Sequence, residues 1–133
     1  MTERAPTDAT ALKGKTGLAR LINAARYSRD GLIEAWRNED AFRQEVLLAA
    51  VMIPVALALP VTVVEKILLV LVVLAVLVVE LLNTAIEATV DRDSTRIDAL
   101  GKRAKDYGSA AVLIALLAAG GTWIAVLWTN FIH

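Results

Sequence analysis

Long apolar stretches alternate with short polar segments along most of the chain. Residues 46–64 form a run of 19 residues without a charged side chain, and residues 67–79 and 107–133 form two further uncharged runs. At a rise of about 1.5 Å per residue, about 20 residues of helix cross a hydrocarbon core roughly 30 Å thick. The pattern therefore predicts an all-α membrane protein with three transmembrane helices.

Prolines and polar residues set the expected ends of these helices. Pro60 is expected to stop the first helix, and Pro54 should kink it. The second uncharged run is too short to span a membrane alone, so its helix must continue through acidic residues. The predicted spans are residues 40–60, 66–91 and 106–129.

The N-terminal part of the chain has a different pattern. Between Leu18 and Trp36, apolar side chains recur largely at spacings of three and four, and four arginines lie in residues 17–37. This periodicity predicts an amphipathic helix on the membrane surface, although a helix packed on a soluble core is the alternative. Residues 1–16 lack apolar periodicity, so we expect a disordered tail followed by one membrane-embedded domain at 17–133.

Composition narrows the chemistry that this chain can perform. Hydrophobic residues make up 57% of the chain, well above the share usual for a soluble domain. Basic and acidic residues both number 14, which gives no reason to expect a nucleic-acid partner. Cysteine is absent, which excludes thiolate sites, and the single histidine, His133, argues against a histidine-based triad or metal site. Any chemistry must rest on carboxylates, amides, hydroxyls and cations.

The basic residues are distributed unevenly between the predicted loops. Eight lie before residue 46, one is Lys66, five lie in residues 92–105, and none follows. By the positive-inside rule, the N-terminus and the loop before the third span are cytoplasmic. The chain is therefore expected to be a multi-pass protein with its C-terminus outside.

A polar stripe runs along the cytoplasmic half of the second predicted span. Glu80 and Glu87 lie seven residues apart on one helix face, about 20 and 30 Å below a helix entry near Ile67. Because an ionisable residue in a membrane span is costly, we expect these two acids to be functional. The alternative is that both acids only pair with cations of other helices. The stripe consists of Glu80, Asn83, Thr84, Glu87 and Asp91.

Two other segments bring polar groups to the same level. Glu39 and Glu45 flank the start of the first span, and Lys105 and Asp106 open the third. Carboxylates, a lysine and a helix N-terminus suit a magnesium–triphosphate complex. Alternatively, the basic residues serve simply as positive-inside charges, and Glu45 simply caps its helix or extends toward water. The sequence holds no GxxxxGK[ST] motif of soluble nucleotide-binding folds.

Several segments together resemble the small prokaryotic integral-membrane diacylglycerol kinases. They are ELLNTAIEATVDR at 80–92 and GKRAKDYGSAAVLIAL at 101–116, preceded by AARYS and AFRQE. The resemblance covers about residues 17–128, and the GSAAV continuation is more similar to the diacylglycerol branch than to the undecaprenol kinase branch. The chain departs from the family at Tyr107, Pro54 and Pro60, which affects helix geometry rather than chemistry.

The resemblance implies a homotrimeric lipid kinase of the bacterial inner membrane. Such an enzyme transfers the γ-phosphate of ATP, with Mg²⁺ as cofactor, to the 3-hydroxyl of diacylglycerol and forms phosphatidic acid at the cytoplasmic interface. By similarity, Glu80 is the general base, Glu39 and Glu87 bind magnesium, Lys105 binds phosphate, Asn83 and Asp106 seat nucleotide or substrate, and Arg20, Glu45 and Ser109 line the site.

Two alternatives to this interpretation stay open. An undecaprenol kinase would use the same chemistry, and the residues do not distinguish an acyl chain from an isoprenoid. A small oligomeric channel or transporter could use the acidic stripe as its pathway, but nothing polar lines the outer half of the spans. Small residues on one face of the third span favour close packing and oligomerisation in either case; they are Ala111, Ala115 and Ala119.

Overall fold

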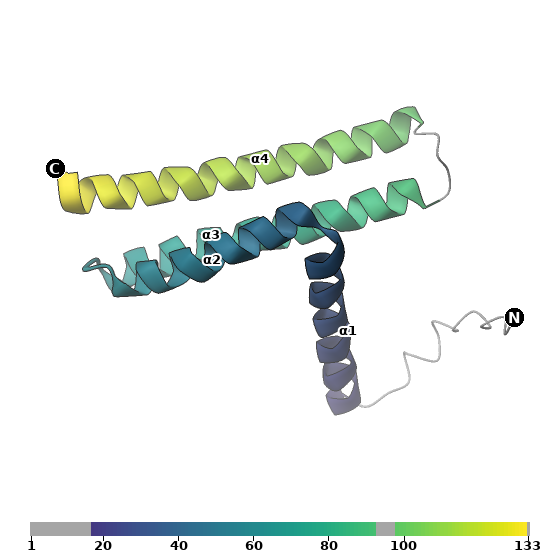
Figure 1. The fold of residues 1–133 in the computed structure, drawn as a ribbon, viewed down its shortest axis with the longest axis horizontal. Coiled ribbons are helices and arrows are strands. Elements are labelled where there is room, and N and C mark those ends of the chain that lie inside the picture. Colours follow the sequence, from purple (N-terminus) through teal and green to yellow (C-terminus); the bar gives the residue numbers. More distant parts are fainter. Residues whose placement is uncertain (1–16, 93–97, 133) are drawn as a thin grey trace, which may run out of the picture. The chain divides into compact units, whose positions relative to one another are not determined.

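The computed structural model describes residues 17–92 and 98–132, and every element in them is helical (Figure 1). The elements are α1 (Gly17–Asn38), α2 (Asp40–Ala58), α3 (Val63–Asp91), α4 (Ala99–Leu127) and the π-helical turn η2 (Trp128–Ile132). Residues 1–16, for which we expect a disordered tail, lie outside the described part of the chain. The all-α fold class is confirmed.

Among the described residues, three helices are long and apolar enough to cross a membrane. They are α2, α3 and the continuous helix from Ala99 to Ile132, as the uncharged runs predict. The chain divides into two units, one ending at Glu34 and one beginning at Ala35. The second unit contains all three candidate spans, so this protein is a membrane protein.

The first unit holds most of α1. Its apolar side chains lie at helical spacing and are largely exposed; examples are Leu18, Leu21, Ile22, Leu32 and Ile33. A helix with an exposed apolar face and arginines between its apolar positions suits the surface of an anionic membrane. The expected surface helix is therefore supplied by α1.

A short turn joins α2 to α3. Helix α2 runs through Pro54 and ends at Ala58, and Leu59 is extended because the following Pro60 disfavours the helical conformation there. Thr62 then caps α3: its hydroxyl accepts from the Glu65 backbone N–H at 3.2 Å, and the Glu65 carboxylate accepts from the Thr62 backbone N–H at 2.8 Å. This capping box starts α3 at Val63.

Side chains from α3 and η2 fasten this end of the bundle, which we call the turn end. Asn130 Nδ2 donates to Glu65 Oε1 at 3.0 Å and to the Val126 carbonyl at 2.9 Å. Lys66 Nζ donates to the Leu57 carbonyl at 2.7 Å. The polar groups of the turn end are thus paired among α2, α3 and η2.

Helix α3 is the central element of the bundle, because it packs against both α2 and α4 (Figure 1). Ala56 of α2 and Leu69 of α3 are fully buried, and Trp123 Nε1 donates to the Leu69 carbonyl at 3.3 Å. The small alanines let α2 approach α3 closely. The buried core consists of Ala49, Ala56, Leu69, Val73, Trp123 and Val126.

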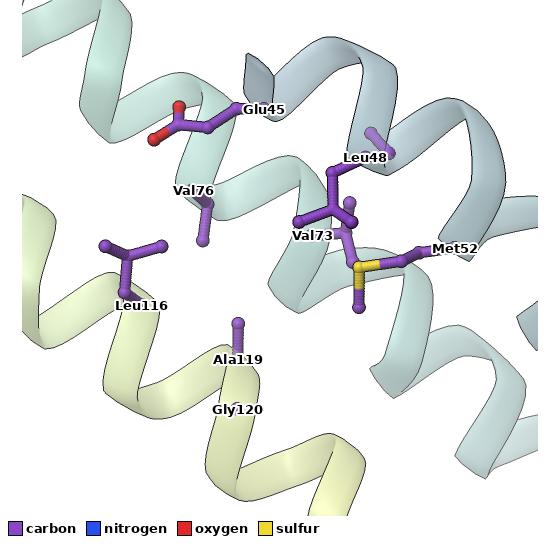
Figure 2. Close-up of a pocket in the computed structure, with 9 residues that line it drawn as sticks. Glu45, Leu48, Met52, Val73, Val76, Leu116, Ala119 and Gly120 are labelled. Carbon is purple, nitrogen blue, oxygen red and sulfur yellow. The ribbon is translucent and has the colours of Figure 1, made fainter. Parts of the chain in front are cut away.

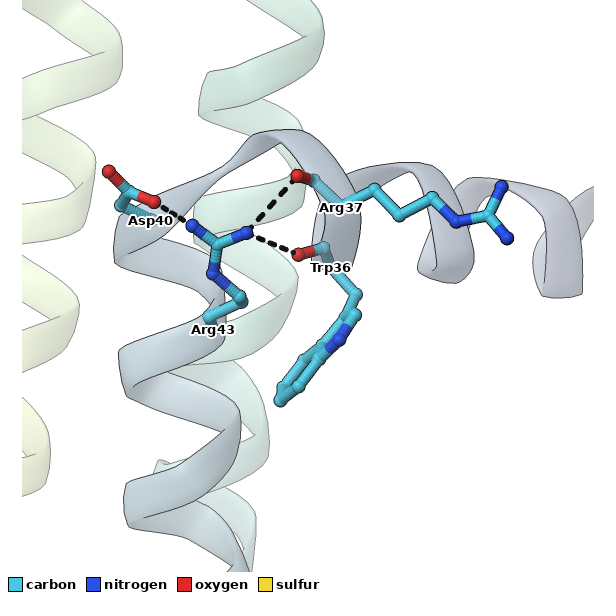
Figure 3. A network of polar contacts seen from close by, with 4 residues as sticks. All are labelled: Trp36, Arg37, Asp40 and Arg43. Atoms are coloured by element: carbon cyan, nitrogen blue, oxygen red, sulfur yellow. Dashed lines mark hydrogen bonds and ion pairs between the residues drawn. The ribbon is translucent and has the colours of Figure 1, made fainter.

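Arg43 organises the opposite end of α2, where the chain leaves α1 (Figure 3). Its Nη1 donates to the carbonyl oxygens of Trp36 and Arg37, each at 3.1 Å, and its Nη2 pairs with Asp40. These carbonyls lie in the last turn of α1, where a helix leaves its acceptors unpaired. The Arg43 guanidinium in the first turns of α2 therefore supplies hydrogen-bond donors to the unpaired carbonyl groups at the end of α1.

A capping side chain also defines the start of α4. Asp98 accepts a hydrogen bond from the Gly101 backbone N–H at 2.6 Å, so α4 begins at Ala99. The helix thus starts well before residue 106, where the third span is predicted to begin. Lys105 and Asp106 consequently lie inside the helix rather than at its N-terminus.

We predict that Ala56→Leu lowers the free energy of unfolding by about 1–3 kcal/mol, because the larger side chain has no room between α2 and α3. Ala50→Leu on the same helix is the matched control, since Ala50 is exposed in the protomer. Denaturant unfolding in detergent micelles, followed by tryptophan fluorescence, measures both variants. Equal stability of the two variants would contradict the packing described above.

Candidate active site

In the part of the chain that the structure describes, two polar side chains are buried in the second half of α3. Glu80 is 6% exposed and Asn83 is 9% exposed, and both belong to α3. A three-residue spacing places them on the same face of the helix, one turn apart. That face is directed at the neighbouring helices rather than at lipid, as the cost of placing a carboxylate in hydrocarbon requires.

Three further carboxylates lie near this buried pair, and together with Glu80 we call them the acidic cluster: Glu39, Glu45, Glu80 and Glu87. Glu39 and Glu87 are close enough to act electrostatically on Glu80, and Glu80 acts in the same way on Glu45. Glu39, Glu45 and Glu87 are half-buried. The start of α2 and the second half of α3 thus concentrate negative charge in one place.

Two buried oxygen atoms at this site lack hydrogen-bond partners among the described residues. They are Glu45 Oε2 and Asn83 Oδ1. Asn83 Nδ2 donates to Glu87 Oε1 over a long distance of 3.4 Å. An unpartnered buried acceptor is costly, so both atoms are suited to accept a donor or to bind a cation supplied by a ligand.

Lys105 and Asp106 of α4 each form an ion pair. Lys105 Nζ lies 2.9 Å from Asp91 Oδ1, and this pair joins the end of α3 to the start of α4. Asp106 Oδ2 lies 2.7 Å from Lys102 Nζ on the same helix. The lysine nitrogen is therefore held beside α3, with its side chain about a quarter exposed.

Two other predicted site residues are exposed. Ser109 follows the buried Gly108 on α4 and is itself exposed. Arg20 lies on α1 in the first unit, where it is also exposed. The structure thus brings the acidic cluster and Asn83 together and pairs Lys105 with Asp91, one helical turn beyond Glu87, whereas Arg20 belongs to the other unit.

One contact at the site is absent from the sequence interpretation. A β-carbon on Gly108 would lie 2.2 Å from Asn83 Oδ1, so the asparagine amide occupies the space that any other residue would need. The pairing of Gly108 with Asn83 depends on how α4 is aligned against α3. The glycine after the Lys-Asp pair is the sequence signal that could have pointed to this contact.

An apolar pocket of about 220 Å³ adjoins the acidic cluster (Figure 2). Glu45 is the charged residue of its lining, and in Figure 2 its carboxylate lies at one end of the pocket. The remaining lining residues come from α2, α3 and α4: Leu48, Ala49, Met52, Val73, Val76, Leu116, Ala119 and Gly120. The pocket places apolar surface next to the half-buried Glu45 side chain.

The donor set of the acidic cluster fits a magnesium ion that arrives with a phosphate ligand. Within residues 17–92 and 98–132, no three carboxylates converge into a metal site of their own. Magnesium often uses one or two carboxylates and completes its coordination with phosphate oxygens and water. Carboxylate oxygens and the unpartnered Glu45 Oε2 provide the hard acceptors that such an ion requires.

Known proteins resemble this chain over most of its length. The family model described as prokaryotic diacylglycerol kinase matches residues 26–127. A diacylglycerol kinase of Pseudomonas aeruginosa is 53% identical over 115 residues, which cover 86% of this chain and 94% of that relative. The Escherichia coli K12 and Haemophilus influenzae diacylglycerol kinases are each 48% identical, over 87% and 85% of this chain and 95% and 96% of their own lengths.

We predict that Glu45→Gln and Glu65→Gln change stability in opposite directions. Glu45→Gln should raise the free energy of unfolding by about 1 kcal/mol without ligands, because it removes charge from a buried, unpartnered oxygen near Glu80. Glu65→Gln should lower the thermal midpoint, because the Glu65 carboxylate accepts hydrogen bonds from Thr62 and Asn130. Thermal unfolding in detergent without magnesium or nucleotide tests both, and shifts of the same sign would refute the contrast.

Proposed function

Because the chain belongs to the prokaryotic diacylglycerol kinase family, we propose that it phosphorylates the 3-hydroxyl of diacylglycerol with the γ-phosphate of ATP. The products are phosphatidic acid and ADP. The main observation that supports the proposal is the acidic cluster. It combines a buried carboxylate with further oxygen ligands in a bundle whose helices suit a membrane. A lipid hydroxyl and a water-soluble nucleotide can meet only at a membrane interface, which is where such a cluster serves.

Glu80 is the proposed general base. It is the most buried carboxylate of the acidic cluster, so it suits a hydroxyl carried by a lipid better than a fully hydrated ion. Its carboxylate would accept the proton of the 3-hydroxyl as the oxygen attacks the γ-phosphorus and the bond to the β-phosphate oxygen breaks. Removal of the proton leaves the hydroxyl oxygen as the better nucleophile.

Glu39 and Glu87 are the proposed magnesium ligands. Both are half-buried and both act electrostatically on Glu80, so they flank the base without being as deeply enclosed. Magnesium bound there would neutralise charge on the phosphates of ATP. The carboxylates themselves would hold the metal-bound nucleotide on the aqueous side of Glu80.

The remaining predicted residues position the nucleotide or the lipid. Lys105 would bind a phosphate group, and its contact with Asp91 would hold the ammonium near the end of α3. Asn83 and Asp106 would seat nucleotide or substrate, and Arg20, Glu45 and Ser109 would line the site. The apolar pocket beside Glu45 supports a lipid substrate rather than a small soluble alcohol.

We place the enzyme in the bacterial inner membrane as a homotrimer with its N-terminus in the cytoplasm. The uneven distribution of basic residues supports this orientation. Many large apolar side chains of the protomer are exposed, for example Leu71, Leu74 and Val78 on α3, so they are available to lipid or to other subunits. A central helix with exposed apolar residues supports assembly with further copies.

A phosphorylation assay with the purified protein tests the proposed function. Dioleoylglycerol and undecaprenol are offered separately in mixed micelles with Mg-ATP, and the phosphorylated lipid is identified by mass. We expect phosphatidic acid to form much faster than undecaprenyl phosphate, in line with the names of the relatives above. Exclusive phosphorylation of undecaprenol would overturn the substrate assignment, and ion flux in vesicles without phosphorylation of either lipid would favour a channel.

We predict that Glu80→Gln and Glu87→Gln fail in different ways. Glu80→Gln should reduce turnover about 100- to 10,000-fold and still bind Mg-ATP, because it removes the proton acceptor but not a metal ligand. Glu87→Gln should weaken Mg-ATP binding at least about tenfold, because it removes an anionic ligand. Nucleotide titrations with and without magnesium, together with lipid phosphorylation, separate the two effects. Near-normal turnover of Glu80→Gln would exclude its role as the base.

We predict that two inactive variants restore activity when they assemble together. Glu39 precedes α2 and Glu80 lies on α3; if Glu39 of one subunit meets Glu80 of another at a composite site of the homotrimer, a mixed assembly can contain one intact site. The purified Glu39→Gln and Glu80→Gln proteins are denatured, mixed and allowed to reassemble in detergent. Each variant reassembled alone is the control. Recovery of part of the parent activity is expected, whereas a fully active monomer would contradict the composite site.

A further inference from the structure

Gly108 of α4 is set apart from other glycines of the helices by what surrounds it. A β-carbon added at Gly17, Gly31, Gly120 or Gly121 would meet nothing within 4 Å, whereas one at Gly108 would overlap a neighbouring side chain. Gly108 is also buried. No described glycine has a positive φ, so the backbone conformation at Gly108 does not require a glycine. A glycine inside a helix is less favourable than alanine, and the close contact therefore supplies the reason for it.

The side chain that fills this space is the amide of Asn83. The added β-carbon would lie 2.2 Å from Asn83 Oδ1 and 3.3 Å from its Cγ. Asn83 is 9% exposed, so its amide has little free space in which to move. In this position Nδ2 donates to Glu87 Oε1 at 3.4 Å, close to the longest distance at which a hydrogen bond holds.

We propose that Gly108 is a positioning residue, whose missing side chain leaves the room that holds the Asn83 amide between α3 and α4 and within reach of the Glu87 carboxylate. The inference rests on the proposed function, in which Glu87 holds Mg-ATP. Gly108 touches neither nucleotide nor metal in this account. It acts only through Asn83.

The contact between Gly108 and Asn83 predicts specific kinetic changes in the Gly108→Ala variant. The new methyl group would displace the Asn83 amide and break its long hydrogen bond to Glu87, which leaves the Glu87 carboxylate free to rotate. Mg-ATP binding should weaken, and the KM for Mg-ATP should rise at least about fivefold. The apolar pocket does not include Gly108, so the KM for the lipid should stay within about twofold.

The test combines Gly108→Ala with Asn83→Ala and uses Gly121→Ala as the matched control on the same helix. Direct Mg-ATP binding is titrated for the parent, the single variants and the double variant. The side-chain amide resonance of Asn83, identified by its loss in Asn83→Ala, is followed by NMR in micelles. We expect Gly108→Ala, but not Gly121→Ala, to shift this resonance, and we expect Gly108→Ala to change Mg-ATP affinity less than about twofold once Asn83 is alanine.

Two results would overturn the proposal. One is an unshifted Asn83 resonance in Gly108→Ala, and the other is an equal loss of Mg-ATP affinity from Gly108→Ala with and without the Asn83 side chain. If Gly108→Ala alone does not fold, the double variant must fold, because the methyl group then has room; failure of the double variant also overturns the proposal. A parent enzyme that phosphorylates another lipid would refute the proposed substrate but leave the amide shift unchanged.

Discussion

The cost of burying polar groups among apolar helices governs the arrangement of this protein. A carboxylate or an amide within a membrane-spanning helix cannot face hydrocarbon, so Glu80 and Asn83 must point toward other helices. This requirement makes α3 the central element, packed against α2 on one side and α4 on the other. Because α2 and α4 cover the polar face of α3, Glu45 of α2 and Gly108 of α4 lie close to its polar side chains.

The two ends of the bundle treat their polar groups in opposite ways. At the turn end, the capping box of Thr62 and Glu65 and the contact from Asn130 pair the polar side chains with one another. At the acidic cluster, carboxylates lie near each other and two buried oxygens have no partner in the described residues. Such an arrangement costs stability, and a bound cation and phosphate would offset that cost. The contrast supports the proposal that ligands bind at the acidic cluster.

Helical periodicity explains why much of this could be predicted from the sequence. The spacing of Glu80, Asn83 and Glu87 fixes them to one face whatever the rest of the chain does, and hydropathy alone predicts the three spans. The contacts of Gly108 with Asn83 and of Lys105 with Asp91 depend on the alignment of α4 against α3, which no local pattern encodes. Asp98 is a local capping signal, and it extends α4 beyond the uncharged run that hydropathy detects.

Paramagnetic broadening by Mn²⁺, used in place of magnesium with ATP, tests the central claim that the acidic cluster holds the metal-bound nucleotide. Val63 and Glu87 begin and nearly end α3, about 36 Å apart along the helix at about 1.5 Å per residue. In micelles containing the isotope-labelled parent protein, we expect Mn²⁺ with ATP to broaden the backbone resonances around Glu87 and Asn83 and to leave those near Val63 sharp. Equal broadening along α3, or broadening confined to the turn end, would contradict the account.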